Sequence, residues 1–499
     1  MHSVFGYVKK KAARGRYLEH FEQVIAKGGA SEDTLAGIVA LASAGGDVEK
    51  ASRVGVRLVE ACPGEISLHQ NAAVGCFLDG NYQAAKAIWT RSQDERARLV
   101  KERNLDRHNR RFLGPAWFIA IGHIAHLDTY LKHQILLGNG LRRLEPVIPG
   151  NVKVPNRYLL DLWKPYFNND ADEERLDFDL PLVSLLQDEF WSIRFGPRDT
   201  EMFSYAGARV QREWEARKLG PLLSIPEGDR DRGWNEMEKL GVPRNGWFVC
   251  LHVREPGFHK TWHNAYPGTR NADVLTYLLA AQRVIEQGGF VIRMGDPTMK
   301  KLPPMTGLID YAHSEAKSEF MDIFLCAMCR FFIGTNSGLG LVPPVFGVPC
   351  AMTNWSPIGL PQWYPADRFI PKLIYSETEE RVLTFNEMLS TPAGWSQFET
   401  FFARGGLRVI DNTPEELRDL VEEMIEEIEG TVRHSDGDIS LIRRFERLMS
   451  DRGSYHGARI GLAFLRQHAK LFDRESEPRP IEGGSSGLPA RIPEGAAEA

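Results

Sequence analysis

The sequence lacks long apolar runs, a marked excess of either charge, and the cysteine density of a disulfide-bonded domain. No stretch approaches about 18 uninterrupted apolar residues, so we expect no membrane-spanning helix. Lysine and arginine total 61 against 66 aspartates and glutamates, a net charge of −5. This balance provides no general basic field for binding phosphates, and we expect no nucleic-acid partner.

The six cysteines are scattered over 499 residues, which argues against a disulfide framework and for a reducing compartment. Cys326 and Cys329 form a lone Cys-x-x-Cys pair in an apolar segment, where core packing is the commoner role. His259 and His263 lie in a loop without a Cys or carboxylate pattern at metal-ligand spacing, so the sequence predicts no metal site.

A basic cluster, Lys9 to Arg16, is not followed by the apolar core of a secretory signal. We expect a cytoplasmic protein. The cluster is interpreted either as a solvated helix face or as a contact with anionic lipid at the inner face of the membrane.

What is present is a length that allows about two to four domains, with apolar and charged contents typical of globular chains. Residues 1–110 have the pattern of successive helices. Two similar segments, around Gly46 and Gly80, lie 34 residues apart, which is the tetratricopeptide period. The sequence therefore predicts a short tetratricopeptide-like helical repeat region, which is either an ordinary pair of helical hairpins or a surface for a protein partner.

The pattern changes at residue 115. Residues 117–121 are a continuous apolar run, which predicts a strand buried on both faces. Gly122 and His123 then precede an amphipathic helix that ends near Gly138. We interpret this strand, loop and helix as the start of an N-terminal Rossmann-like domain, 111–235, whose loop lies where open α/β sheets bind ligands.

From residue 246 onward, strand and helix patterns alternate, which predicts a doubly wound parallel sheet. Strands are predicted at 247–253, 290–294, 331–333 and 348–352, and helices at 273–287, 318–328 and after Thr413. We therefore predict a C-terminal Rossmann-like domain at 236–430, followed by C-terminal helices at 431–473. The composition of the tail at 474–499 predicts disorder.

Polar residues follow three predicted strands at their carboxyl ends: His252, Arg254 and Glu255; Arg293, Gly295 and Asp296; and Thr335, Asn336, Ser337 and Gly338. An arginine at such an edge can hold a diphosphate through paired hydrogen bonds or can pair with a buried carboxylate. The third loop leads into a helical segment, where free N–H groups favour phosphate. The run matches neither the Walker loop nor G-x-G-x-x-G, so ATP hydrolysis and dinucleotide chemistry lose support.

Together these segments resemble a family of bacterial glycosyltransferases. The resemblance lies in the order and spacing of His252–Glu255, Arg270–Asp273, Ile292–Gly295, Phe320–Ile323 and Phe331–Leu339. More distantly, His252-x-Arg254 is similar to the motif with which GT-B fucosyltransferases hold the donor diphosphate. This chain has Glu255-Pro256-Gly257 where those enzymes have Arg-x-Asp.

The resemblance implies a GT-B-like pair of Rossmann-type domains that transfers sugar from a nucleotide-sugar donor, bound by the C-terminal domain, to a glycan or lipid-linked acceptor. It implies a role in cell-envelope polysaccharide synthesis, with no cofactor and no required metal. The implied donor-binding residues are His252, Arg254, Glu255, Arg270, Asn271, Arg293, Gly295, Asp296, Asp322, Thr335, Asn336, Ser337 and Gly338.

Two residues are predicted to be catalytic. Arg254 would hold the departing diphosphate, and His123, preferred over Asp128, would be the general base facing the donor from the other domain. Pyruvyl transfer to a polysaccharide and a non-catalytic scaffold with a helical repeat are the alternative functions.

Overall fold

The computed structural model describes residues 48–61, 66–78, 81–105, 110–138, 143–148, 150, 152–167, 190–197, 199–255, 268–360, 362–396, 399–451 and 457–472. The basic N-terminal cluster and the predicted disordered tail lie outside these residues. No helix in the described ranges is both long and apolar enough to cross a bilayer.

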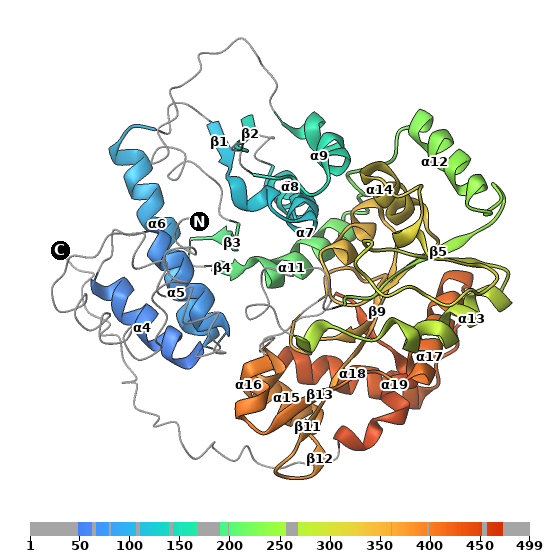
Figure 1. Ribbon diagram of the computed structural model, residues 1–499. Helices are drawn as coiled ribbons and strands as arrows, with labels where there is room; N and C mark the ends of the chain where they lie inside the picture. The colour runs from blue at the N-terminus through green and yellow to red at the C-terminus, as the bar shows by residue number, and fades with distance from the viewer. Residues whose placement is uncertain are drawn as a thin grey trace.

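Three helices lie side by side at one side of the molecule (Figure 1): α4 (Val48–Ala61), α5 (Ile66–Leu78) and α6 (Tyr82–Glu102). Small residues allow close packing, because a Cβ on Gly55 of α4 would lie 3.0 Å from the Cβ of Ala72 in α5. The start of the first proposed repeat lies outside the described residues, so the tetratricopeptide-like repeat stays a prediction.

The next unit begins with β1 (Arg110–Leu113), which pairs in parallel with β2 (Arg143–Pro146). The connection contains the 3-10 helix η2 (Pro115–Phe118), α7 (Ile121–Ala125) and α8 (Leu127–Leu136). The strand predicted at 117–121 is therefore wrong. Pro115 starts a helical turn there, and burial of Trp117 and Phe118 explains the apolar run without a strand.

The remaining elements of this unit are α9 (Arg157–Trp163), η3 (Lys164–Tyr166), β3 (Ser192–Gly196), β4 (Asp199–Met202), α11 (Phe203–Ala216) and α12 (Glu227–Lys239). Strands β3 and β4 form an antiparallel pair. In the described part of 111–235 the strands thus form two separate pairs, and the Rossmann-like sheet of this domain stays a prediction.

The largest element of the fold is a seven-stranded, all-parallel sheet, as the alternating pattern predicted. Its spatial order is β14-β10-β9-β8-β5-β6-β7. The strands are β5 (Phe248–His252), β6 (Phe290–Arg293), β7 (Leu308–Ile309), β8 (Phe332–Gly334), β9 (Cys350–Trp355), β10 (Arg368–Pro371) and β14 (Arg459–Ile460). Strand β14 comes from the segment 431–473, for which only helices were predicted, and it pairs with β10.

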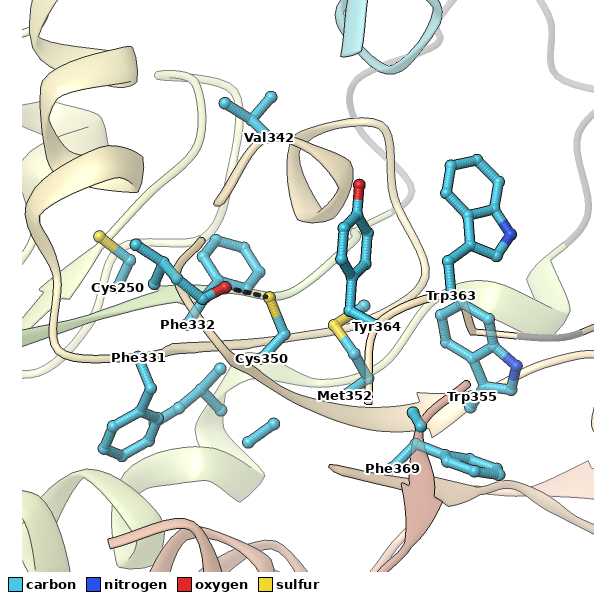
Figure 2. Close-up of a cluster of buried hydrophobic side chains, with 14 of the residues drawn as sticks. Cys250, Phe331, Phe332, Val342, Cys350, Met352, Trp355, Trp363, Tyr364 and Phe369 are labelled. Carbon is cyan, nitrogen blue, oxygen red and sulfur yellow. Dashed lines mark hydrogen bonds between the residues drawn. The ribbon is translucent and has the colours of Figure 1, made fainter. Parts of the chain in front are cut away.

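Helices cover both faces of this sheet (Figures 1 and 2). On one face α13 (Leu278–Glu286), preceded by η4 (Gly268–Arg270) and η5 (Val274–Tyr277), packs against α17 (Pro414–Glu429). The predicted start of α17 is confirmed, since the Thr413 hydroxyl accepts from Glu416 N while the Glu416 carboxylate accepts from Thr413 N. On the other face lies α14 (Glu319–Met328), packed against α9 and α12.

A smaller antiparallel sheet follows β10 in the chain. It contains β11 (Leu373–Ser376), β12 (Arg381–Val382) and β13 (Leu407–Ile410). The helices around it and after it are α15 (Phe385–Ser390), η9 (Pro392–Gly394), α16 (Glu399–Arg404), α18 (Asp436–Asp451), α19 (Leu462–Gln467) and η10 (Ala469–Phe472).

The core around β8 and β9 is apolar and rich in sulfur (Figure 2). Cys250 and Cys350 lie in it, and Cys326 and Cys329 are also buried free thiols, as the core-packing interpretation predicted. Burial raises the pKa of the Cys326 thiol, so it stays protonated at neutral pH. In the described ranges, no group of three or more His, Cys, Asp or Glu side chains is arranged to hold a metal ion.

Candidate active site

The sheet order creates a crevice at the carboxyl ends of β5 and β8. From β5 the chain adds β6 and β7 on one side of the sheet, and then returns to place β8, β9 and β10 on the other. Connections that leave adjacent strands in opposite directions leave a crevice between them, where open α/β sheets bind ligands. The residues after β5 and after β8 are therefore the first candidates for a site.

Hydrogen bonds join these two segments. Thr335 N donates to the His252 carbonyl oxygen at 3.1 Å, and Arg254 N donates to Thr335 Oγ1 at 2.8 Å. Ser337 Oγ lies 3.1 Å from His252 Nδ1. Asn336 Nδ2 donates to Ser356 O, after β9, at 2.9 Å. The structure thus joins the polar segments that follow β5 and β8.

Arg254 is partly exposed at this edge. Its Nη1 donates to Asn271 Oδ1 at 3.1 Å. Asn271 is itself held in place, because buried Lys372 donates to its carbonyl oxygen at 2.6 Å while pairing with Asp411. The side chains of Arg254 and Asn271 are therefore positioned together. Arg270 is the last residue of η4 and directly precedes Asn271.

Arg293 and Glu255, both implied as donor contacts, contact each other. The Arg293 side chain is 0% exposed, and its Nη2 donates to Glu255 Oε2 at 3.0 Å and to Lys300 O at 2.9 Å. Its Nη1 donates to Asp310 Oδ1 at 2.8 Å. The Arg293 side chain thus connects the segments after β5 and β6, and its implied role as a donor contact stays a prediction.

Gly295 and Asp296 shape the turn after β6. Gly295 has φ +141° and a Cβ there would lie 2.2 Å from Met299 Sδ, so only glycine fits. Asp296 Oδ1 accepts from Thr298 N at 2.8 Å, so this side chain caps the turn.

In the described residues, Asp322 makes no hydrogen bond to the loop after β8, and its implied role in donor binding stays a prediction. It accepts from Tyr311 Oη at 2.9 Å and from Lys317 Nζ at 2.9 and 3.2 Å. Lys317 is a cation near His252 that sequence reasoning missed. The sequence did contain a signal for Lys317, because this residue directly precedes Ser318, the N-cap of the helix predicted at 318–328.

The electrostatic environment of His252 is positive. The residue is 8% exposed, and burial together with the positive charges of Arg293, Lys317 and Arg254 lowers its pKa to about 4, while Asp296 opposes the shift. The ring is therefore neutral at pH 7.

The loop after β8 offers backbone donors but no long helix. It leads into η7 (Leu339–Leu341) and η8 (Pro343–Phe346), which are too short for the helix macrodipole that was expected. The backbone N–H groups of residues 336–338 donate to no other described residue. Three successive free N–H groups can accommodate phosphate oxygens in place of a helix N-terminus.

The unit containing α7 touches this loop directly. A Cβ on Gly122 would lie 2.8 Å from Gly338 Cα, so the two backbones are in contact. His123 follows in α7 and not in a strand-end loop as predicted. Its Nδ1 lies 2.6 Å from Ala116 O, and because a carbonyl only accepts, Nδ1 carries the proton and Nε2 the lone pair. Burial lowers the pKa of His123, so the ring is neutral at pH 7.

Asp128, the other base considered, is fully buried. Its Oδ2 accepts from Lys132 Nζ at 2.6 Å and from Tyr364 Oη at 3.0 Å. Burial raises its pKa despite the neighbouring lysine. No acceptor hydroxyl can reach it, which leaves His123 as the candidate base.

A polar groove of about 660 Å³ lies elsewhere, between α6 and β4. Much of its charge is neutralised by ion pairs, including Arg98 with Glu95 and Lys86 with Glu201. This groove lies beside helix α6 and not at the carboxyl edge of the seven-stranded sheet, so we do not take it as the candidate active site. Its lining residues are Gln83, Lys86, Ala87, Thr90, Arg91, Asp94, Glu95, Arg98, Asp199 and Thr200.

Solved structures of glycosyltransferases are similar to parts of this chain at low identity. The dodecameric iron-containing heptosyltransferase TibC, in complex with ADP-D-β-D-heptose, is 14% identical over 49% of this chain and 58% of that chain, with a TM-score of 0.28. Another structure of TibC, from enterotoxigenic E. coli, is 12% identical over 65% of this chain and 76% of that one, with a TM-score of 0.33.

A glycosyl transferase of family 9 from Veillonella parvula is 12% identical, with a TM-score of 0.22 over 45% of this chain and 60% of that chain. The chain thus spans less than two thirds of the length of two of these three structures. No protein-family model and no curated protein matches the sequence. Likeness at this level does not establish a shared activity.

Proposed function

We propose that the protein is a GT-B-type glycosyltransferase that moves a sugar from a nucleotide-sugar donor to a glycan or lipid-linked acceptor. The main support is the hydrogen-bonded arrangement of His252 and Arg254 with Thr335 and Ser337 at the crevice between β5 and β8. These residues belong to the motifs that resemble bacterial glycosyltransferases. In this proposal residues 236–430 bind the donor and 111–235 bind the acceptor.

Departure of a nucleoside diphosphate leaves negative charge on its terminal phosphate, and fixed donors in a preorganised site stabilise that charge. Arg254 supplies a guanidinium group and residues 336–338 supply backbone N–H groups, while Lys317, near His252, is paired with Asp322. These groups provide the positive charge that the leaving group requires, so the proposal includes no metal or other cofactor.

For an inverting transfer, the acceptor hydroxyl must lose its proton as its oxygen bonds to the anomeric carbon and the bond from that carbon to the diphosphate breaks. The Nε2 lone pair of His123 is suited to take this proton, because Ala116 O holds the proton on Nδ1. Its low pKa keeps that lone pair free at neutral pH. The Gly122–Gly338 contact supports a place for His123 near the donor loop.

The setting of the reaction is also part of the proposal. We place it in cell-envelope polysaccharide synthesis on the cytoplasmic side, with the basic N-terminal cluster available to touch the inner membrane face. The helices α4 to α6 would present a surface for a protein partner.

The decisive test is thermal stabilisation by UDP, GDP, CDP, CMP, dTDP, ADP and phosphoenolpyruvate. A ligand at about 100 times its dissociation constant adds about 2.7 kcal/mol to the stability of the folded state. We expect one nucleotide to raise the melting temperature of the wild type and of Arg244→Ala, a control at an exposed ion-paired arginine. We expect no such rise for Arg254→Ala.

Other outcomes contradict the proposal. Stabilisation by phosphoenolpyruvate alone would indicate pyruvyl transfer, and no stabilisation by any compound would favour the scaffold. A nucleotide effect that survives in Arg254→Ala would remove Arg254 from the donor site.

A further inference from the structure

The position of the proton on His252 follows from its contact with Ser337. The His252 ring is neutral at pH 7, so one of its nitrogens carries a hydrogen and the other a lone pair. In the described residues the ring makes one hydrogen bond, between Nδ1 and Ser337 Oγ at 3.1 Å. The direction of that bond therefore decides what Nε2 presents to a ligand.

Ser337 has a hydrogen to donate. Its Oγ already accepts from Gly340 N at 3.2 Å, so the backbone occupies one of its lone pairs. In the described ranges its other polar partner is His252 Nδ1, and a neutral imidazole nitrogen with a lone pair is an acceptor for the hydroxyl hydrogen. Within the described residues, the reverse direction would leave that hydrogen with only solvent as an acceptor, because Ser337 is half-buried.

We infer that Ser337 donates to His252 Nδ1 and thereby fixes the histidine as the tautomer protonated on Nε2. His252 is then a neutral N–H donor at the crevice, and Ser337 is a positioning residue that acts through it. The ligand chemistry that fits is a phosphate or sugar oxygen, which accepts a hydrogen bond. The use of this donor rests on the proposed function, whereas the tautomer does not.

The same reasoning gives His123 the opposite arrangement. Ala116 O requires the proton on Nδ1 of His123, so its Nε2 accepts. The two rings would thus have opposite tautomers, and in the proposed function His252 donates to the donor substrate while His123 accepts from the acceptor hydroxyl. In an experiment on the ring nitrogens, His123 can therefore serve as a reference for His252.

The test is nitrogen NMR of the full chain with ¹⁵N-labelled histidine at pH 7.5, where protonated and unprotonated ring nitrogens give separate signals. The His252→Gln variant lacks the signals of His252, and the His123→Gln variant lacks those of His123. Comparing each spectrum with that of the wild type therefore assigns the signals of the two rings. We expect His252 to be protonated on Nε2 and His123 on Nδ1. We expect Ser337→Ala to convert His252 into a mixture of tautomers, and Ser337→Thr, which keeps the hydroxyl, to restore the single form.

Ser435→Ala is the matched control, because Ser435 Oγ accepts from Asp438 N at 3.2 Å, as Ser337 Oγ does from Gly340 N, without touching His252. It should leave the His252 signals unchanged. A wild-type His252 protonated on Nδ1, or a tautomer that is unaffected by Ser337→Ala, would overturn the inference.

Nucleotide binding separates this inference from the proposed function. With the nucleotide that stabilises the wild type, Ser337→Ala should weaken binding about tenfold, the scale of one hydrogen bond to a charged group, and Ser337→Thr should recover it. If no nucleotide binds while the tautomers are as expected, the proposed function fails and the assignment of Ser337 stands. Unchanged affinity in Ser337→Ala would overturn the role of His252 as a donor to the ligand.

Discussion

At the scale of single residues, buried histidines connect the stability of the protein to pH. Burial lowers the pKa of His126 to about 3, against about 6.5 for an unperturbed histidine. Below pH 6.5 the unfolded state therefore binds a proton that the folded state does not. The stability contributed by neutral His126 is complete above about pH 6.5 and is lost as the pH falls toward 3.

Replacing His126 by phenylalanine should therefore stabilise the protein more in acid than at neutral pH. The ring packs against Phe203 and Trp363 at centroid distances of 4.8 and 5.1 Å, and its buried Nδ1 has no hydrogen-bond partner in the described residues. His126→Phe keeps a planar ring and removes both the unpaired nitrogen and the titration.

The measurement is urea unfolding of both proteins at pH 7.5 and pH 5. The advantage of His126→Phe should grow by up to about 1.4 kcal/mol for each pH unit below 6.5. An advantage of the same size at both pH values would show that His126 titrates normally in the folded state.

The sequence identified the main residues of the candidate site but not which of them contact one another. His252, Arg254 and Ser337 were found because polar residues directly follow apolar strands. That Arg293 is buried between Glu255 and Asp310 depends on the packing of loops far apart in the chain, which no local pattern contains. Lys317 was missed because it lies before a helix and not after a strand.

At the scale of elements, strands buried on both faces were the most predictable. Strand β5 is fully buried and was placed correctly from its apolar run. The same criterion failed at 117–121, where a short run in the core is part of a 3-10 helix and a turn. The neighbouring strand β1 contains two arginines, Arg110 and Arg111, and so lacks the apolar signal.

The contact of α7 with the loop after β8 predicts that a side chain at Gly122 lowers the stability of the protein. Gly122→Ala places a Cβ 2.8 Å from Gly338 Cα, where backbone must move to make room. We expect a lower melting temperature, by several degrees for a cost of about 1 to 3 kcal/mol, and weaker nucleotide binding because residues 336–338 are displaced.

The control is Gly220→Ala, where an added Cβ meets no atom within 4 Å. Differential scanning calorimetry with and without nucleotide measures both effects. If Gly122→Ala behaves like Gly220→Ala in both respects, the close approach is not required for the structure of the loop.

At the scale of the whole molecule, the apolar core is divided. One large cluster runs from Leu113 to Phe472 and includes residues of both the 111–235 unit and the seven-stranded sheet. Helices α4 to α6 have a second cluster, which contains Leu58 and Trp89 and contacts Met202 and Tyr205 at its margin. The helices should therefore open separately from the rest.

Hydrogen exchange followed by mass spectrometry checks this division. Amides of α4 to α6 should lose protection at lower urea concentrations than those of β5 and β8, because fewer buried contacts hold the helices. A single common opening energy for all three helices and both strands would mean that the two clusters unfold as one.

The doubly wound class was predictable at this scale, but the location of the crevice was not. Alternating strands and helices gave the class, whereas the neighbours β5 and β8 are separated in the chain by β6 and β7. Their adjacency depends on the direction in which the chain crosses the sheet.

The paired glycine backbones at Gly122 and Gly338 also restrict how substrates enter. The side chains of Ile121 and Leu341 surround this contact, because a Cβ on Gly338 would lie 3.3 Å from Ile121 Cγ2 and a Cβ on Gly122 would lie 3.2 Å from Leu341 Cδ1. No ligand can pass between the two backbones at this point. A molecule that binds the loop after β8 must therefore reach it from another side.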